Sequence, residues 1–158
     1  MDSPRSGPVR ILIVEDNRGD VVLVREALND SAMPFELTHV SDGEQALDFL
    51  HRRFPHADAA RPDLVLLDLN LPKHDGWEVL SEIRSMPEFI DTPVVILSSS
   101  GNPEDRERAA STPNALHIRK PSTLDEFLAI GDQIARFWSE RSNHLVKPTS
   151  SLNASREL

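Results

Sequence analysis

The sequence predicts an α/β domain in which one parallel β-sheet carries helices on both faces. Short apolar runs alternate five times with segments of helical periodicity, and this order of elements is typical of a doubly wound sheet. Three of the runs, residues 9–14, 64–67 and 94–97, are almost continuously apolar, as expected of strands buried on both faces. Polar residues follow each of these runs, and a parallel sheet would collect them at one edge.

The run that ends in Asp68 is the most informative, because four consecutive apolar residues lead to a single carboxylate. Pro62 precedes the run and Leu71-Pro72 follows it, so the segment is too short for a helix and lies between residues that break one. A strand here places Asp68 at the carboxyl end of the sheet, where ligands bind in open α/β folds. Asp68 is therefore the first candidate for chemistry.

The first strand is predicted over Val9–Val14 and ends in the acidic pair Glu15 and Asp16. A helix is expected over residues 17–29, because its apolar residues recur three and four positions apart on one face. A short strand over residues 35–40 completes the first strand–helix–strand unit.

The second helix is expected to begin at Ser41–Glu44, which has a capping-box pattern. Residues 53–62 contain two prolines and no periodicity, which indicates a loop. After the strand that ends in Asp68, residues 71–76 form a turn, and Asp75 can cap the third helix.

The fourth strand, Val94–Leu97, delivers the hydroxyl of Ser98 where the earlier strands deliver carboxylates. Asn102-Pro103 then begins a short polar helix with proline at its first position. The last strand covers Ala115–Arg119 and is followed by Lys120.

The final helix is expected to start at residues 122–125 and to reach about Trp138. Its apolar residues cover about half of its circumference, more than the roughly 100° that one core contact needs, so part of this surface should meet a partner. We divide the chain into a flexible N-terminus (1–8), one domain (9–140) and a polar, poorly ordered tail (141–158).

The composition excludes several classes of protein. A formal net charge of -9 argues against a nucleic-acid-binding protein, because such proteins need a basic face. Without cysteine, no disulfide, thiolate nucleophile or cysteine-bound metal is available. No stretch resembles a signal peptide or reaches the roughly 18 apolar residues of a membrane span, so we expect a cytoplasmic protein that binds no membrane.

Five candidate residues fall at the carboxyl ends of the predicted strands: Glu15, Asp16, Asp68, Ser98 and Lys120. Three carboxylates repel one another unless a cation lies between them, and oxygen ligands of this kind suit Mg²⁺. An aspartate beside that ion, with a lysine and a hydroxyl opposite, is arranged to accept a phosphoryl group.

These motifs resemble the receiver domain of two-component response regulators. In chain order they are Val14-Glu15-Asp16-Asn17, Leu67-Asp68-Leu69-Asn70-Leu71-Pro72, Asp75-Gly76, Pro93-Val94-Val95-Ile96-Leu97-Ser98 and Lys120-Pro121. The resemblance covers roughly residues 9–140 and implies a flavodoxin-like five-stranded parallel sheet of order 2-1-3-4-5. It also implies a stand-alone receiver, without a DNA-binding output domain.

Three features are most similar to the single-domain regulators paired with bacterial phytochrome histidine kinases. They are Glu15-Asp16-Asn17 with Asp20, the Asp68-Leu69-Asn70 run and the Phe137-Trp138 end. The expected partners are thus a histidine kinase, of the bacteriophytochrome type, and a second copy of the chain, bound through the last strand and the last helix.

The resemblance implies that Asp68 is the phosphoacceptor and attacks the phosphorus of a kinase phosphohistidine. The side chains of Asp16 and Asp68 and the backbone carbonyl of Asn70 would bind Mg²⁺, and Glu15 would reach it through water. The chain would then be a phosphoacceptor with at most self-catalysed phosphotransfer and autodephosphorylation, not an enzyme that acts on other substrates.

Lys120 would pair with the phosphoryl oxygens, and Ser98 would hydrogen-bond one of them and pull in the loop after the fourth strand. His117 occupies the switch position, where the family commonly has tyrosine or phenylalanine. Because histidine titrates near neutral pH, coupling to the output surface would be sensitive to pH. Two further departures are Glu15, where many members have aspartate, and Thr112-Pro113-Asn114, which implies a short or displaced fourth helix.

Other interpretations remain open at this stage. Asp68 alone could cap a turn, and Glu15 and Asp16 could cap the first helix. A haloacid-dehalogenase-type phosphatase also has an aspartate after an apolar strand, but it needs a second acid two residues on, where this chain has Asn70. A pseudo-receiver that docks without being phosphorylated is the main alternative, although all five pocket positions carry competent side chains.

Overall fold

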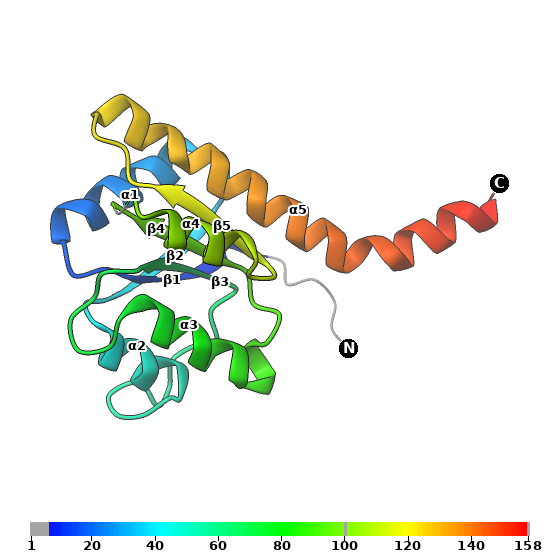
Figure 1. Cartoon of the computed structure of the whole chain (residues 1–158). Coiled ribbons are helices and arrows are strands. Elements are labelled where there is room, and N and C mark those ends of the chain that lie inside the picture. Colours follow the sequence, from blue (N-terminus) through cyan, green and yellow to red (C-terminus); the bar gives the residue numbers. More distant parts are fainter. Residues whose placement is uncertain (1–6, 100, 158) are drawn as a thin grey trace.

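The structure is a computed structural model that describes residues 7–99 and 101–157 of the chain, with side chains described up to residue 142. It contains five strands and five α-helices in alternation, with one 3₁₀ turn, η1 (Figure 1). In chain order the elements are β1 (Val9–Val14), α1 (Arg18–Asp30), β2 (Phe35–Val40), α2 (Gly43–Leu50), β3 (Leu64–Asp68), α3 (Gly76–Ser85), η1 (Pro87–Phe89), β4 (Val94–Ser98), α4 (Pro103–Ala110), β5 (Ala115–Arg119) and α5 (Leu124–Glu157).

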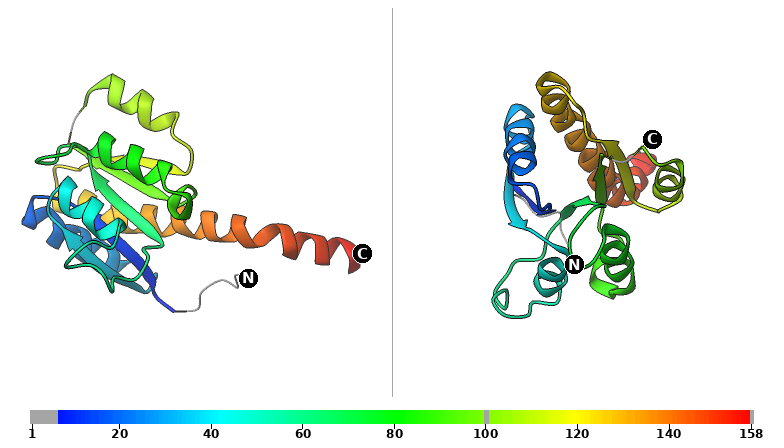
Figure 2. Two further views of the ribbon diagram at one scale, coloured as in Figure 1. Left: turned by 90° about the horizontal axis from the view of Figure 1, so that it is seen from below. Right: turned by 60° about the vertical axis from the view of Figure 1, so that its left-hand side comes forward.

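The strands form one parallel sheet of order β2-β1-β3-β4-β5, which confirms the predicted fold class and strand order. Helices α1 and α5 cover one face, and α2 and α3 cover the other, as Figures 1 and 2 show from different sides. Helix α4 contacts the second of these faces near β5 through its one buried residue, Ala109. Strands β2 and β5 are the two edges of the sheet.

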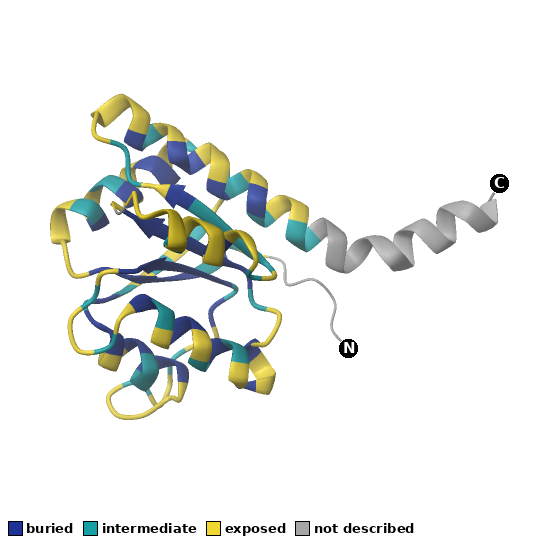
Figure 3. Ribbon diagram, viewed as in Figure 1, coloured by how far each residue is buried: buried dark blue, intermediate teal, exposed yellow. Residues whose placement is uncertain are grey.

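Side chains alternate between two separate cores along each central strand. In β1, Leu12 and Val14 point to the core under α2 and α3, whereas Ile11 and Ile13 point to the core under α1 and α5. Strand β3 is buried at all five positions, and Figure 3 shows the same for the centre of the sheet. The nearly continuous apolar runs in the sequence are therefore explained by burial on both faces.

The start of α2 differs by one residue from the capping box predicted at Ser41. Asp42 is the N-cap instead, because its carboxylate accepts the N–H of Gln45 at 2.7 Å, and the helix begins at Gly43. The side chain of Gln45 reaches back and accepts the N–H of Ser41 at 2.8 Å. The predicted cap at Asp75 is confirmed, as part of a capping box.

The last helix is longer than predicted, since α5 continues past Trp138 to Glu157. Two contacts accompany the first turn of this continuation: the Arg141 guanidinium lies 4.9 Å from the centre of the Phe137 ring, and the Ser142 hydroxyl donates to the Trp138 carbonyl at 3.0 Å. Side chains beyond residue 142 and residues 1–6 lie outside the described part of the chain, so poor order at the two ends stays a prediction. Among the described residues, no helix has an apolar stretch long enough to cross a membrane.

Helices α1 and α5 approach closely at Gly131, which is buried. A β-carbon at this position would overlap the carbonyl group of Ala27 on α1. Glycine is therefore required here by the contact between two helix backbones, although glycine is a poor helix former.

We predict that Gly131→Ala destabilises the protein by about 2–3 kcal/mol, because the two helices must move apart. This result is opposite to the gain of about 1 kcal/mol that alanine gives over glycine inside an unconstrained helix. Urea denaturation measures the change in the free energy of unfolding. Ser139→Ala, at an exposed position of the same helix, is the control and should be neutral or slightly stabilising. A Gly131→Ala variant as stable as the wild type would contradict the close packing of α1 and α5.

Candidate functional site

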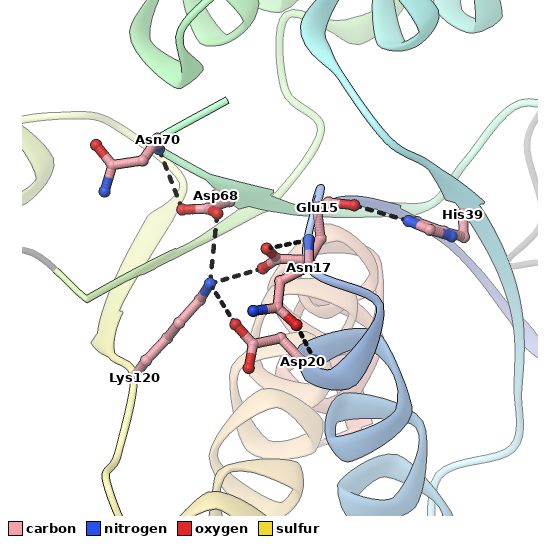
Figure 4. A network of polar contacts seen from close by, with 7 residues as sticks. All are labelled: Glu15, Asn17, Asp20, His39, Asp68, Asn70 and Lys120. Carbon is pink, nitrogen blue, oxygen red and sulfur yellow. Dashed lines mark hydrogen bonds and ion pairs between the residues drawn. The ribbon is translucent and has the colours of Figure 1, made fainter. Parts of the chain in front are cut away.

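Charged side chains from three strand ends meet at the carboxyl edge of the sheet. Glu15 follows β1, Asp68 is the last residue of β3, and Lys120 follows β5. Glu15 and Asp68 are only 1% and 5% exposed, so these two carboxylates are held within the protein. Figure 4 shows the three side chains pointing toward one another.

The ammonium group of Lys120 is at the centre of this pocket. Its Nζ lies 2.8 Å from Glu15 Oε1, 2.9 Å from Asp20 Oδ2 and 3.3 Å from Asp68 Oδ2. Because an ammonium group has three N–H donors, it can serve all three carboxylates at once. The backbone fixes where this side chain starts, since the N–H of Lys120 donates to the carbonyl of Ser98 at 2.9 Å.

Backbone and imidazole donors hold the carboxylates and their strands in place. The N–H of Asn70 donates to Asp68 Oδ1 at 3.1 Å, and the N–H of Asn17 donates to Glu15 Oε2 at 3.1 Å. The imidazole Nε2 of His39, on β2, lies 2.7 Å from the carbonyl oxygen of Glu15 and donates to it. Asp68 therefore meets a backbone N–H with one oxygen and the lysine with the other.

Burial and charge shift the pKa values of both central groups. Burial raises the pKa of Glu15 to about 7, the hydrogen bond from Lys120 partly offsets this, and the nearby charge of Asp68 adds to the rise. Burial alone would lower the pKa of Lys120, but its bonds to Glu15 and Asp20 and the charge of Asp68 raise it above the usual 10.5. Lys120 thus stays charged at any physiological pH.

Three of the carboxylates could bind a metal ion together. Glu15, Asp16 and Asp68 each offer an oxygen, and these oxygens lie within 4.8 Å of one another. Hard anionic oxygens suit Mg²⁺ or Mn²⁺ rather than softer metals. Asp16 is exposed, so an ion can reach the cluster from solvent. The donor set thus fits the divalent cation predicted from the sequence.

Two of the other predicted residues border the pocket. Ser98, the last residue of β4, is fully buried and pairs in register with Arg119 on β5. Asn70 is exposed and contributes the backbone donor to Asp68 (Figure 4). The structure thus brings six of the predicted site residues to one place: Glu15, Asp16, Asp68, Asn70, Ser98 and Lys120.

His117 lies outside this pocket, on β5 opposite Ile96 and three residues before Lys120. Its pKa is lowered, first by burial and then by the charge of Arg106, whereas Asp105 opposes this shift. Both charged neighbours belong to α4, so the imidazole of His117 lies on the side of β5 that faces this helix. At neutral pH its imidazole is therefore uncharged.

Two polar residues of the pocket are absent from the predicted site. Asp20 accepts a hydrogen bond from Lys120, whereas in the sequence it stood out only as part of the family resemblance. A signal existed, because Asp20 lies three residues after the helix cap Asn17, and a side chain in the first turn of that helix faces the same sheet edge. His39 gave no such signal, since it occupies an ordinary position in an edge strand.

Comparison with known proteins gives a consistent result. Residues 11–131 match the response regulator receiver domain family. Response regulator Rcp1 from Synechocystis sp. is 37% identical over 140 residues, which cover 89% of this chain and 95% of Rcp1. The Mn²⁺-bound crystal structure of Rcp1 superposes with a TM-score of 0.76 at 39% identity, covering 83% of this chain and 94% of that one.

Two further solved structures are similar. The phosphorylated cyanobacterial phytochrome response regulator RcpA has a TM-score of 0.77 at 43% identity, covering 84% of this chain and 94% of RcpA. The bacteriophytochrome response regulator RtBRR has a TM-score of 0.67 at 37% identity, covering 79% of this chain and 77% of RtBRR.

The raised pKa of Glu15 predicts how stability depends on pH without metal. The folded protein keeps a proton on Glu15 up to about pH 7, whereas the unfolded chain loses it near pH 4.5. The free energy of unfolding should therefore fall as pH rises through this range, by about 3 kcal/mol. Urea denaturation in EDTA at several pH values, compared with Glu15→Gln, measures this contribution. Equal pH profiles for the two proteins would contradict it.

Proposed function

The chain belongs to the response regulator receiver domain family, and we propose that it accepts a phosphoryl group on Asp68 from a histidine kinase. One observation carries this proposal: Asp68 combines a neighbouring ammonium group, 3.3 Å away, with two further carboxylates that can share a cation. A carboxylate in these surroundings is a nucleophile whose product, an acyl phosphate, has its charge balanced on both sides.

In the proposed reaction an oxygen of Asp68 attacks the phosphorus of a kinase phosphohistidine. The P–O bond forms as the P–N bond breaks, and the electron pair of that bond returns to the imidazole. Lys120 then exchanges its contact with Asp68 for one with a phosphoryl oxygen. The backbone N–H of Asn70 fixes the carboxylate oxygen that does not react. Most of the catalysis is positioning and charge stabilisation.

Receiver domains bind a divalent cation, and we propose Mg²⁺ for this chain. Asp16 and Asp68 would hold it with their carboxylates and Asn70 with its backbone carbonyl, and Glu15 would act through water. When bound, the ion neutralises charge on the phosphoryl oxygens as they approach Asp68.

We propose that the hydroxyl of Ser98 and the side chain of His117 carry the signal to α4. Helix α4 can respond because Ala109 is its one buried residue. The indole N–H of Trp77, on α3, donates to Asp105 at 3.0 Å, and Arg108 lies 4.4 Å above the Trp77 ring. These contacts at the surface are easier to rearrange than a packed core.

The similarity to RcpA and RtBRR supports a kinase of the bacterial phytochrome type as the phosphodonor.

We also propose a homodimer through β5 and α5. Strand β5 is an edge strand, and an open groove of about 700 Å³ lies between it and the first turns of α5. Sedimentation before and after phosphorylation would test this assembly, and a monomer in both states would exclude it.

We predict that incubation with acetyl phosphate and Mg²⁺ adds the mass of one phosphoryl group to the wild type. Asp68→Asn should show no gain, because an amide is not a nucleophile toward phosphorus, and EDTA should prevent the gain in the wild type. Intact mass spectrometry measures both results.

Asp63→Asn is the matched control, because this residue also flanks β3 but lies at its other end, where it accepts the N–H of Arg10. It should be phosphorylated as the wild type is. If the wild type gains no phosphoryl group either from acetyl phosphate or from a phosphorylated phytochrome kinase, the chain is a docking module without phosphoacceptor chemistry.

A further inference from the structure

Asp20 is the acidic residue of the pocket that the proposed reaction does not use. It lies in the first turn of α1, with its side chain 23% exposed, and its Oδ2 is 2.9 Å from Lys120 Nζ. The described carboxylates that could hold a metal together are those of Glu15, Asp16 and Asp68, and Asp20 is not among them. The contact of Asp20 in the pocket is with Lys120 (Figure 4).

The position of Asp20 is fixed by the start of α1. The backbone N–H of Asp20 donates to the side chain of Asn17 at 3.1 Å, which caps the helix. The first turn of α1 therefore brings this carboxylate to the ammonium group from the side opposite to β3, as Figure 4 shows. Lys120 lies between Asp20 on one side and Asp68 on the other.

Lys120 and a divalent cation compete for the same carboxylates. The lysine contacts Glu15 and Asp68, and both belong to the cluster that would bind the ion. An ammonium group with only these two partners would be drawn more strongly onto them, and a cation would have to displace it. Asp20 offers the lysine a third partner that the cation does not need.

We propose that Asp20 is a positioning residue that holds Lys120 away from Glu15 and Asp68 and so keeps these carboxylates available for the divalent cation. The inference deepens the proposed function and rests on it for the identity of the ion. It assigns to Asp20 control over the Mg²⁺ concentration at which the receiver becomes competent for phosphorylation.

Removing the charge of Asp20 should lower the affinity for Mg²⁺ in two ways. In Asp20→Asn the pocket loses one negative charge, and the ammonium group is left to Glu15 and Asp68. Each effect weakens cation binding, and we expect a Kd for Mg²⁺ that is 3- to 10-fold higher.

The first experiment is a calorimetric titration with Mg²⁺ alone. Asp20→Glu should restore most of the affinity, because it keeps a carboxylate near the lysine. Glu26→Gln removes the same charge from an exposed position of the same helix and should leave the Kd within twofold of the wild type. An unchanged Kd in Asp20→Asn, or an equal loss in Glu26→Gln, would overturn the proposal.

A double-mutant cycle separates positioning of the lysine from direct binding of the ion. In a Lys120→Met background no ammonium group competes with Mg²⁺, so Asp20→Asn should change the Kd much less than it does in the wild type. An equal change in both backgrounds would mean that Asp20 acts on the ion itself, and would refute the positioning role.

Failure of this inference is distinct from failure of the proposed function. A wild type that binds Mg²⁺ but is never phosphorylated would refute the phosphoacceptor role and leave the effect of Asp20 on Mg²⁺ affinity intact. A wild type that is phosphorylated, with the same Mg²⁺ dependence in Asp20→Asn, would refute the positioning role alone.

Discussion

The pocket holds four carboxylates but one ammonium group, and this excess of negative charge governs the rest of the site. The four belong to Glu15, Asp16, Asp20 and Asp68, and Lys120 is the cation that contacts three of them. Such an arrangement is unfavourable unless a proton, a second cation or a phosphoryl-bound metal relieves the repulsion. The pKa of Glu15 is raised by burial first and by the charge of Asp68 in addition, which favours a proton on this carboxylate.

The strands that carry these carboxylates are closely packed, and this packing holds the side chains together despite their repulsion. Strands β1 and β3 are buried on both faces, and the loop after β3 folds closely beneath the site. The N–H of Gly76 donates to the carbonyl of Leu69 at 2.9 Å, and a β-carbon at Gly76 would overlap the backbone of Asp68 and Leu69. Glycine therefore lets α3 start against the backbone of Asp68 and Leu69, which fixes the chain that carries the Asp68 side chain.

The sequence predicted the features that depend on local chemistry and burial. Apolar runs located the strands because both faces of a central strand are covered, and the parallel topology then placed Glu15, Asp68 and Lys120 at one edge. The contact of Asp20 with that lysine could not be predicted in the same way. It depends on the distance between two residues that lie a hundred positions apart in the chain, and the packing of α1 against α5 and the sheet sets that distance.

The central strands are closely packed, whereas α4 is packed loosely. This difference determines which part of the surface a phosphoryl group on Asp68 would change. Strands β1 and β3 lie in a close-packed core, and rearranging this core in response to a new charge would cost much free energy. Strand β4 is buried as fully as β3, but Ser98 lies at its end, and the helix that follows, α4, buries only Ala109 and contacts Trp77 through Asp105 and Arg108. A new charge causes rearrangement first where the contacts between elements are weakest. Phosphorylation would therefore change the surface at α4 and the adjoining part of β5.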